Sequence, residues 1–205
     1  MKKEARLSIA SRTALALGAL LMLPALALAH PGHGADGFQH ASARFMDGLL
    51  HPFSGLDHLA AMLAVGVWSA LAVRPVWLAP AAFVTLLTAG AATGFAGVVV
   101  PAVEPMIATS LLVLGLLVAW RRHLPLAVAA GVAGVFAFFH GAAHGAELAG
   151  GSQWQALAGM VIATAALHAT GVVLGRVVMA RHRWMAVAGG GATALLGVSL
   201  LAQLA

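Results

Sequence analysis

The sequence predicts an all-α polytopic membrane protein with six transmembrane helices that follow a cleaved signal peptide. Of its 205 residues, 61% are hydrophobic and only 8% are charged, whereas a soluble domain has roughly 45–50% apolar and about 25% charged residues. Six apolar stretches follow the leader, and most are near the ~20 residues that a helix needs to cross a bilayer. Basic residues gather in alternate connections, as they do in proteins of this class.

The same composition excludes several other classes of protein. The chain has too few charges to cover a globular surface and is too apolar to be disordered. It has no cysteine, which excludes disulfides, thiolate metal sites and iron–sulfur clusters. The net charge of +5 reflects few acids rather than many bases, so it does not indicate nucleic-acid binding. Ten histidines against six acidic residues point instead to a metal ion.

Residues 1–29 have the three parts of a secretory signal peptide. Four basic residues lie among the first twelve, an apolar stretch covers residues 13–28, and Ala27-Leu28-Ala29 forms a small-residue cleavage site. The apolar stretch is short and a polar, glycine-rich sequence follows it, which favours cleavage over an uncleaved first transmembrane helix. The mature chain is then expected to begin outside the cytoplasm.

Residues 30–50 form a histidine-rich N-terminal segment that we expect in the periplasm. After cleavage His30 is the first residue, so its imidazole and the α-amine can chelate one metal ion together. His33, Asp36 and His40 add nitrogen and oxygen donors on what we expect to be a flexible segment, and short histidine-rich tracts are typical of metal binding. We therefore expect His30 and His33 to capture metal ions.

Residues 51–205 form the predicted transmembrane domain of six helices. Prolines stand near the start of four apolar stretches, where the missing backbone N–H suits the first helical turn. The connections are short, so no soluble domain is inserted. The six predicted spans are 53–73, 77–99, 104–120, 124–145, 154–174 and 184–204.

Charge sets the orientation of these spans. With the mature N-terminus outside, the inner connections hold six arginines and the outer segments hold Arg44 alone. This follows the positive-inside rule, and it predicts a multi-pass protein of the bacterial inner membrane with its mature N-terminus in the periplasm. The inner arginines are Arg74, Arg121, Arg122, Arg176, Arg181 and Arg183.

The positions of tryptophan and glycine residues also indicate membrane-spanning helices. All five tryptophans lie near span ends, where an aromatic belt is expected. Gly90 with Gly94, and Gly141 with Gly145, have a four-residue spacing that allows close helix contact. The tryptophans are Trp68, Trp77, Trp120, Trp154 and Trp184.

The first span opens with ionisable residues, which are costly inside a membrane and therefore point to function. They are His51, Asp57 and His58. In a continuous helix, His58 returns to within about 20° of His51 and lies two turns deeper. Asp57 can either accept a hydrogen bond from an imidazole or bind a metal ion directly.

The fourth span ends with a second group of ionisable residues. His140, His144 and Glu147 follow the spacing i, i+4, i+7, so they share one helical face. The first span begins and the fourth span ends on the outer side, so both groups are expected at the same depth. Four imidazoles and two carboxylates suit divalent Ni, Co, Zn or Cu. His168, in the inner half of the fifth span, is a candidate second station.

These two motifs resemble those of the HupE/UreJ family of nickel and cobalt permeases. The family's H-x5-D-H motif matches His51 to His58, and its F-H-G-x-A-H-G-x-E motif matches Phe139 to Glu147 at every fixed position. The leader, the HPGHG start of the mature chain and the six-span layout extend the resemblance over nearly the whole chain. It implies inward passage of Ni²⁺ or Co²⁺ to supply nickel enzymes such as hydrogenase or urease. The residues it implies as essential are His51, Asp57, His58, His140, His144 and Glu147.

We therefore expect a permease, not an enzyme, that moves Ni²⁺, or Co²⁺, from periplasm to cytoplasm by facilitated diffusion. Its expected partners are the divalent ion and membrane lipid, with no nucleic acid and no prosthetic group. Imidazole titrates near pH 6.5, so transport is expected to fall below about pH 6. The sequence leaves open the choice of metal, channel or carrier, proton coupling, the oligomeric state, and which ligands bind at once.

The main alternative is an intramembrane zinc-dependent hydrolase of the alkaline-ceramidase type. Three histidines and a carboxylate with one position open for water suit catalytic Zn²⁺ as well as transport. The N-terminal histidine segment has no evident use in such an enzyme. A haem-binding membrane cytochrome is a further alternative, although carboxylates do not suit axial ligation of haem.

Overall fold

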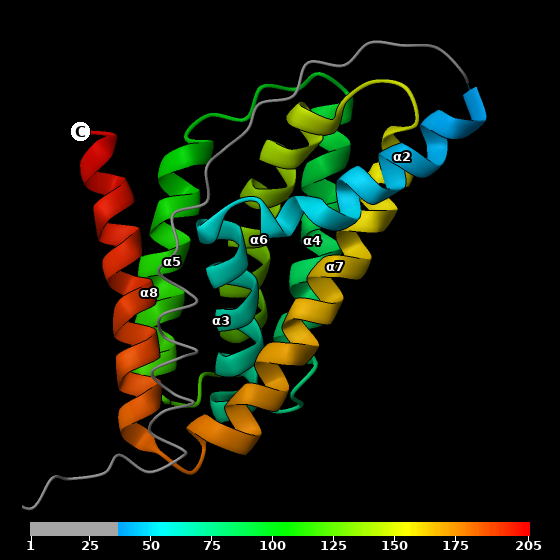
Figure 1. Cartoon of the computed structure of the whole chain (residues 1–205). Helices are drawn as coiled ribbons and strands as arrows, with labels where there is room; N and C mark the ends of the chain where they lie inside the picture. Colours follow the sequence, from blue (N-terminus) through cyan, green and yellow to red (C-terminus); the bar gives the residue numbers. More distant parts are fainter. Residues whose placement is uncertain (1–36) are drawn as a thin grey trace, which may run out of the picture. The chain divides into compact units, whose positions relative to one another are not determined.

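The computed structural model describes residues 37–205, with side chains from residue 44, and this part of the chain contains helices and no strand (Figure 1). The predicted all-α fold is thereby confirmed. The predicted signal peptide, 1–29, and the histidines His30 and His33 lie outside the described residues. The helices are α2 Gly37–Leu50, η1 His51–Phe53, α3 Leu56–Ala72, α4 Leu78–Phe95, α5 Val103–Trp120, α6 Leu126–Leu148, α7 Gln153–Leu174, the π-helical η2 Gly175–Met179 and α8 Arg183–Gln203.

The helices match the predicted spans closely. Five of them, α4 to α8, are long and apolar enough to cross a membrane, with α7 extended through η2. Residues 44–53 and α3 are long and apolar enough only when taken together, and they meet at an angle of 77°, as in a broken span or a re-entrant loop. The chain is thus a multi-pass membrane protein with up to six spans.

The bend before α3 corrects the expectation of one continuous helix through His51 and His58. Pro52 has no backbone N–H to continue the hydrogen-bond ladder of α2, and the chain tightens into the short 3-10 helix η1. Gly55 is then extended, with φ −120° and ψ 131°, and α3 begins at Leu56. His51 and His58 consequently belong to different helices and do not share a helical face.

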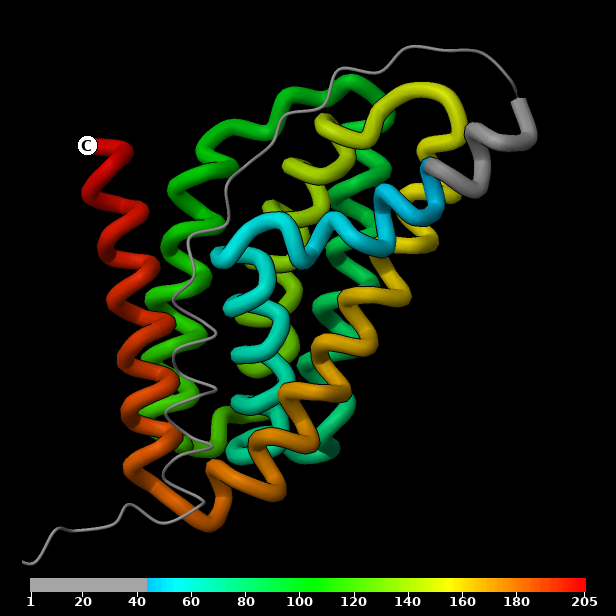
Figure 2. Tube along the Cα trace, in the orientation of Figure 1, coloured from blue at the N-terminus to red at the C-terminus, as the bar shows by residue number. Residues whose placement is uncertain are grey.

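The helix α2 includes His40, which we expected to lie on a flexible segment. It runs across the axis of α3 (Figure 2) and packs on α7. A Cβ atom on Gly48 would lie 1.8 Å from the carbonyl oxygen of Ala156, and one on Gly159 would lie 2.1 Å from that of Phe45. Glycine at both positions therefore lets the two backbones touch.

Arg44 ties α2 to the end of α6. Its Nη2 donates to the carbonyl oxygen of Leu148 at 2.8 Å, and its Nε donates to that of Gly151 at 3.2 Å. A cation at a helix C-terminus stabilises the exposed carbonyl groups there. This contact fixes α2 beside the outer motif of α6.

The two glycine pairs pack against one another, as their spacing predicted. A Cβ on Gly141 would lie 2.0 Å from the carbonyl oxygen of Leu87, and one on Gly90 would lie 2.1 Å from that of Phe138. Backbone-to-backbone contact of this kind holds α4 against α6. The glycines of the α6 motif thus face α4 and leave its histidines for α3.

The helix α3 lies between the α5–α8 pair and α7 (Figure 1). Its Trp68 is fully buried among other core residues, so the prediction that all five tryptophans form an aromatic belt is wrong for this one. Trp68 packs inside the bundle because it lies on the face that α3 turns toward its neighbours. The other four tryptophans are exposed at helix ends: Trp77, Trp120, Trp154 and Trp184.

Candidate metal site

The two predicted groups of ionisable residues meet inside the bundle. η1 and α3 contribute His51 and His58, and the end of α6 contributes His140, His144 and Glu147. Their side chains form two clusters of three that could each hold a metal ion, and His144 belongs to both. The inner cluster is His58, His140 and His144, and the outer cluster is His51, His144 and Glu147.

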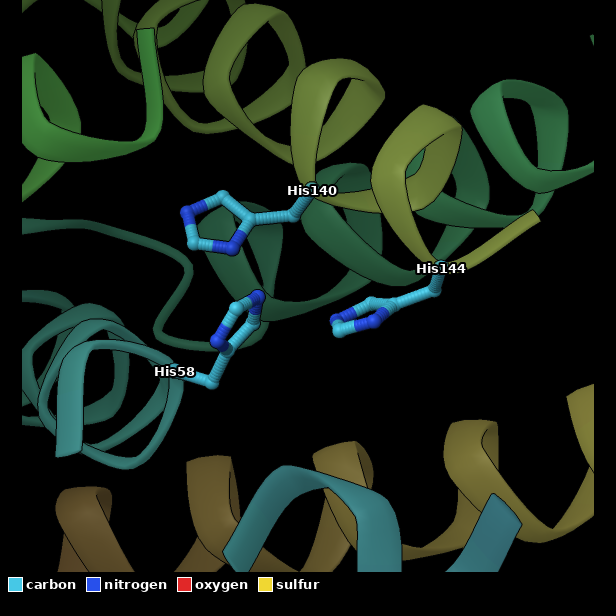
Figure 3. Close-up of side chains that lie close together, drawn as sticks. All are labelled: His58, His140 and His144. Atoms are coloured by element: carbon cyan, nitrogen blue, oxygen red, sulfur yellow. The ribbon is translucent and has the colours of Figure 1, made fainter. Parts of the chain in front are cut away.

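The three imidazoles of the inner cluster point toward one another (Figure 3). Each offers a nitrogen, and these atoms all lie within 4.8 Å of one another. The ring of His58 lies 5.1 Å from that of His140 and 4.4 Å from that of His144, measured between centroids. His140 and His144 are 0% and 1% exposed, so these two rings are closed to bulk water.

One nitrogen of each inner ring is held by a partner. Nδ1 of His58 donates to Oδ1 of Asp57 at 2.9 Å. Nε2 of His140 donates to Oγ of Ser110 at 3.0 Å, because that hydroxyl already donates to the carbonyl oxygen of Ile107. A partner on one nitrogen fixes the tautomer and aims the other nitrogen, as in established metal sites.

The opposite nitrogens have no hydrogen-bond partner, and each has a free lone pair when the partnered nitrogen of its ring carries the proton. Nε2 of His58, Nδ1 of His140 and Nε2 of His144 are buried and have no hydrogen-bond partner within the described part of the chain. A buried polar atom without a partner costs about 1–3 kcal/mol. A divalent cation would satisfy all three lone pairs together, so the inner cluster has the donors of a metal site.

The side chains of the outer cluster lie at hydrogen-bond distances that also suit a coordination shell. Nε2 of His51 lies 2.9 Å from Nδ1 of His144 and 3.0 Å from Oε2 of Glu147. Nδ1 of His144 lies 3.4 Å from the same carboxylate oxygen. An ion bound at about 2.1 Å holds neighbouring ligands about 3.0 Å apart in an octahedron and about 3.4 Å apart in a tetrahedron.

Asp57 orients His58 and belongs to neither cluster of three. Its Oδ1 accepts both the imidazole Nδ1–H and the backbone N–H of His58, each at 2.9 Å. The carboxylate also lies in the first turn of α3, where a helix favours negative charge. A Cβ on Gly55 would lie 2.5 Å from this oxygen, so the glycine makes room for the pair.

A cavity of about 760 Å³ opens beside the two clusters. Asp57, His58 and Glu147 line it, together with Glu104 from the first turn of α5. Glu104 was expected to be a loop charge and not a site residue, although an acid at the outer end of an apolar span was a usable signal. Ser110 was missed as well, since one serine in a span gives little indication of a histidine partner.

His168 does not join either cluster. It is 1% exposed, and neither ring nitrogen has a hydrogen-bond partner among the described residues. The ring of Phe83 lies 5.0 Å from His168 and 5.8 Å from His140, between centroids. Phe83 therefore stands between His168 and the inner cluster.

Apolar helices around buried imidazoles define a helical membrane protein with a candidate metal site in its interior. The chain belongs to the HupE/UreJ family, whose pattern, described as HupE / UreJ protein, matches residues 18–200. It is 44% identical over 186 residues to "Protein HupE" from Rhizobium leguminosarum bv. viciae, which covers 89% of this chain and 94% of the relative. No solved structure matches the chain. Membership of this family implies a transporter of nickel or cobalt.

Proposed function

We propose that this protein is a permease that carries Ni²⁺, or Co²⁺, from the periplasm to the cytoplasm by facilitated diffusion. The family supports transport of such an ion. The observation that carries the proposal is the inner cluster, in which three buried imidazole nitrogens converge without a hydrogen-bond partner. The exposure of the site residues decreases from the cavity toward the inner cluster, and such a gradient suits transport better than catalysis.

Entry begins in the acidic cavity. Asp57, Glu104 and Glu147 line it, and carboxylates gathered in a cleft raise the local concentration of cations. Side-chain exposure then falls from 58% at Glu147 to 26% at His51 and 17% at His58. An ion that follows this gradient meets the outer cluster first and the inner cluster second.

His144 makes the two clusters successive stations for one ion. A neutral imidazole has one lone pair and one N–H. When Nδ1 of His144 binds an ion in the outer cluster, its Nε2 carries the proton and the inner cluster lacks one ligand. Transfer inward moves the proton from Nε2 to Nδ1, where Glu147 accepts the hydrogen bond. The shared ring therefore admits one ion at a time.

Two further steps are proposed, one beyond the two clusters and one before the cavity. His168 is proposed as the next station after the two clusters, reached past Phe83, because its two nitrogens are buried and have no partner in the described structure. His30 and His33 are proposed to capture the ion before it reaches the cavity. In this orientation the mature N-terminus and the cavity face the periplasm, and the end of the bundle that carries the six inner arginines faces the cytoplasm.

The membrane potential supplies enough energy for this transport. Each charge gains about 2.3 kcal/mol per 100 mV, so a divalent ion gains about 4.6 kcal/mol. Each tenfold concentration ratio costs about 1.4 kcal/mol, so this energy supports roughly a thousandfold accumulation of the ion. Binding must also be weak enough for release, and the two successive clusters provide that by sharing one ligand.

Metal entry into liposomes tests the proposal. Purified protein is reconstituted with an interior metal reporter and an inside-negative potential, and Ni²⁺, Co²⁺, Zn²⁺ and Mn²⁺ are compared. We expect potential-driven entry of Ni²⁺ or Co²⁺ that His144→Ala abolishes, because both clusters lose a ligand. His182→Ala is the matched control, since His182 precedes α8 and makes no capping bond through its side chain.

The same assay separates the proposal from a zinc hydrolase. A hydrolase would retain one metal ion per protein after dialysis and would show no potential-driven entry of any ion. Its Glu147→Gln variant would keep the ion tightly bound. That combination of results would reject the permease, whereas entry at the same rate in the His144→Ala variant would reject the two clusters as the path.

A further inference from the structure

Three arginines surround a cavity at the end of the bundle away from the histidine clusters. The cavity has a volume of about 530 Å³. Arg121 and Arg122 reach it from the end of α5 and the connection to α6, and Arg183 reaches it from the first residue of α8. Its other lining residues are Leu71, Trp120 and His123.

Nothing in the described part of the chain neutralises these guanidinium groups. Residues 44–205 contain four side-chain carboxylates, of which Asp57, Glu104 and Glu147 line the cavity beside the histidine clusters, and Asp47 lies on α2. The three cavity arginines have no ion pair or hydrogen bond to another side chain within this part. Charges of one sign that converge on a cavity attract a ligand of the opposite sign.

The backbone of Arg121 is in a conformation that arginine seldom adopts. Arg121 caps the end of α5 in the left-handed region, with φ 58° and ψ 26°. Helices usually place glycine at this position, because a Cβ atom makes the conformation costly. Backbone strain of this kind collects at functional sites, and here it places a guanidinium group beside the cavity.

The neighbours of the arginines place this cavity at the depth of lipid headgroups. Trp120 is 61% exposed and Trp184, next to Arg183, is 63% exposed. Exposed tryptophans at helix ends lie at the membrane interface. Leu71 and the ring of Trp120 add apolar walls, along which an acyl chain can continue into the bilayer.

We propose that this cavity binds the phosphate of an anionic phospholipid, with the guanidinium groups of Arg121, Arg122 and Arg183 as its ligands. Guanidinium groups bind phosphate oxygens in pairs, and basic pockets between transmembrane helices accommodate anionic headgroups. A zwitterionic lipid has the same phosphate, but its choline brings a cation into a cationic cavity. The proposal does not depend on the transported ion.

Native mass spectrometry of the detergent-purified full chain tests the site with phosphatidylglycerol as the probe and phosphatidylcholine as the comparison. The cavity variant is Arg121→Gly with Arg183→Gln. Glycine relieves the strain at position 121, so this variant is expected to fold and melt no lower than the unmodified protein. The control variant, Arg176→Gln with Arg181→Gln, removes the same charge from the same end of the bundle but from residues outside the cavity.

We expect one phosphatidylglycerol per protein, bound more tightly than phosphatidylcholine. The cavity variant should bind it about tenfold or more weakly, as the loss of charge-assisted hydrogen bonds implies, while the control variant keeps its affinity. Equal losses in both variants would show binding to general surface charge and overturn the site. Equal binding of the two lipids, or displacement of the lipid by millimolar inorganic phosphate, would overturn the assignment to a phospholipid.

Discussion

Alanine in place of Gly141 should weaken metal binding although the glycine touches no metal ligand. A Cβ atom at this position would lie 2.0 Å from the carbonyl oxygen of Leu87, and real Cβ contacts essentially never fall below 3.0 Å. The α4 and α6 backbones must therefore separate locally by at least 1.0 Å, the difference between the two distances. Metal geometry tolerates displacements of about 0.5 Å.

The displaced helix carries His140 and His144, two of the three inner ligands. We expect the affinity for Ni²⁺ to fall about 10–100-fold, the range found when groups that orient metal ligands are lost. The overpacked contact should also lower stability by about 1–3 kcal/mol. Isothermal titration calorimetry of the detergent-purified protein measures the affinity, and a thermal melt measures the stability.

Gly131→Ala is the matched control, because it makes the same change on the same helix with nothing within 4 Å of the new Cβ. Alanine is favoured over glycine inside a helix by about 1 kcal/mol, so this variant should melt at the same temperature or higher. It should bind Ni²⁺ as the unmodified protein does. If Gly141→Ala binds Ni²⁺ as tightly as Gly131→Ala, the packing of α4 on α6 does not position the histidines.

Three further predictions concern the proposed path. Gly55→Ala should push the carboxylate of Asp57 away from His58, and calorimetry should show Ni²⁺ affinity about tenfold lower; unchanged affinity would contradict the orienting role of Asp57. Protons compete with metal for imidazole, so Ni²⁺ entry into liposomes should fall as the pH drops from 7.5 to 5.5, and a flat profile would refute this. His168→Leu should slow entry while calorimetry shows unchanged Ni²⁺ affinity and a melt shows no loss of stability; unchanged entry would remove His168 from the path.

The close agreement between predicted and observed helices has a simple physical cause. Apolar length and the position of arginines are local properties of the chain, and a bilayer imposes the same length on each span. The meeting of His58 with His140 and His144 also followed from the sequence, because alternating spans place the start of the first and the end of the fourth on one side.

The pairing within the site did not follow from the sequence. Spacing alone placed His51 and His58 on one helical face, but the break at Pro52 moves His51 to the outer cluster. The sequence left open whether Asp57 binds a metal ion or a histidine. In the structure its Oδ1 accepts a hydrogen bond from Nδ1 of His58. Ser110 lies on another helix, so no local pattern connects it with His140.

The sequence by itself determined the membrane spans, their charge asymmetry and the residues able to bind a metal, because each of these depends on residue type and local spacing. The tertiary structure alone decided that His144 serves two clusters, that Glu104 lines their cavity and that Trp68 is buried. These features depend on the direction in which each side chain points. Contacts between helices that are distant in sequence set that orientation, and no periodicity records it.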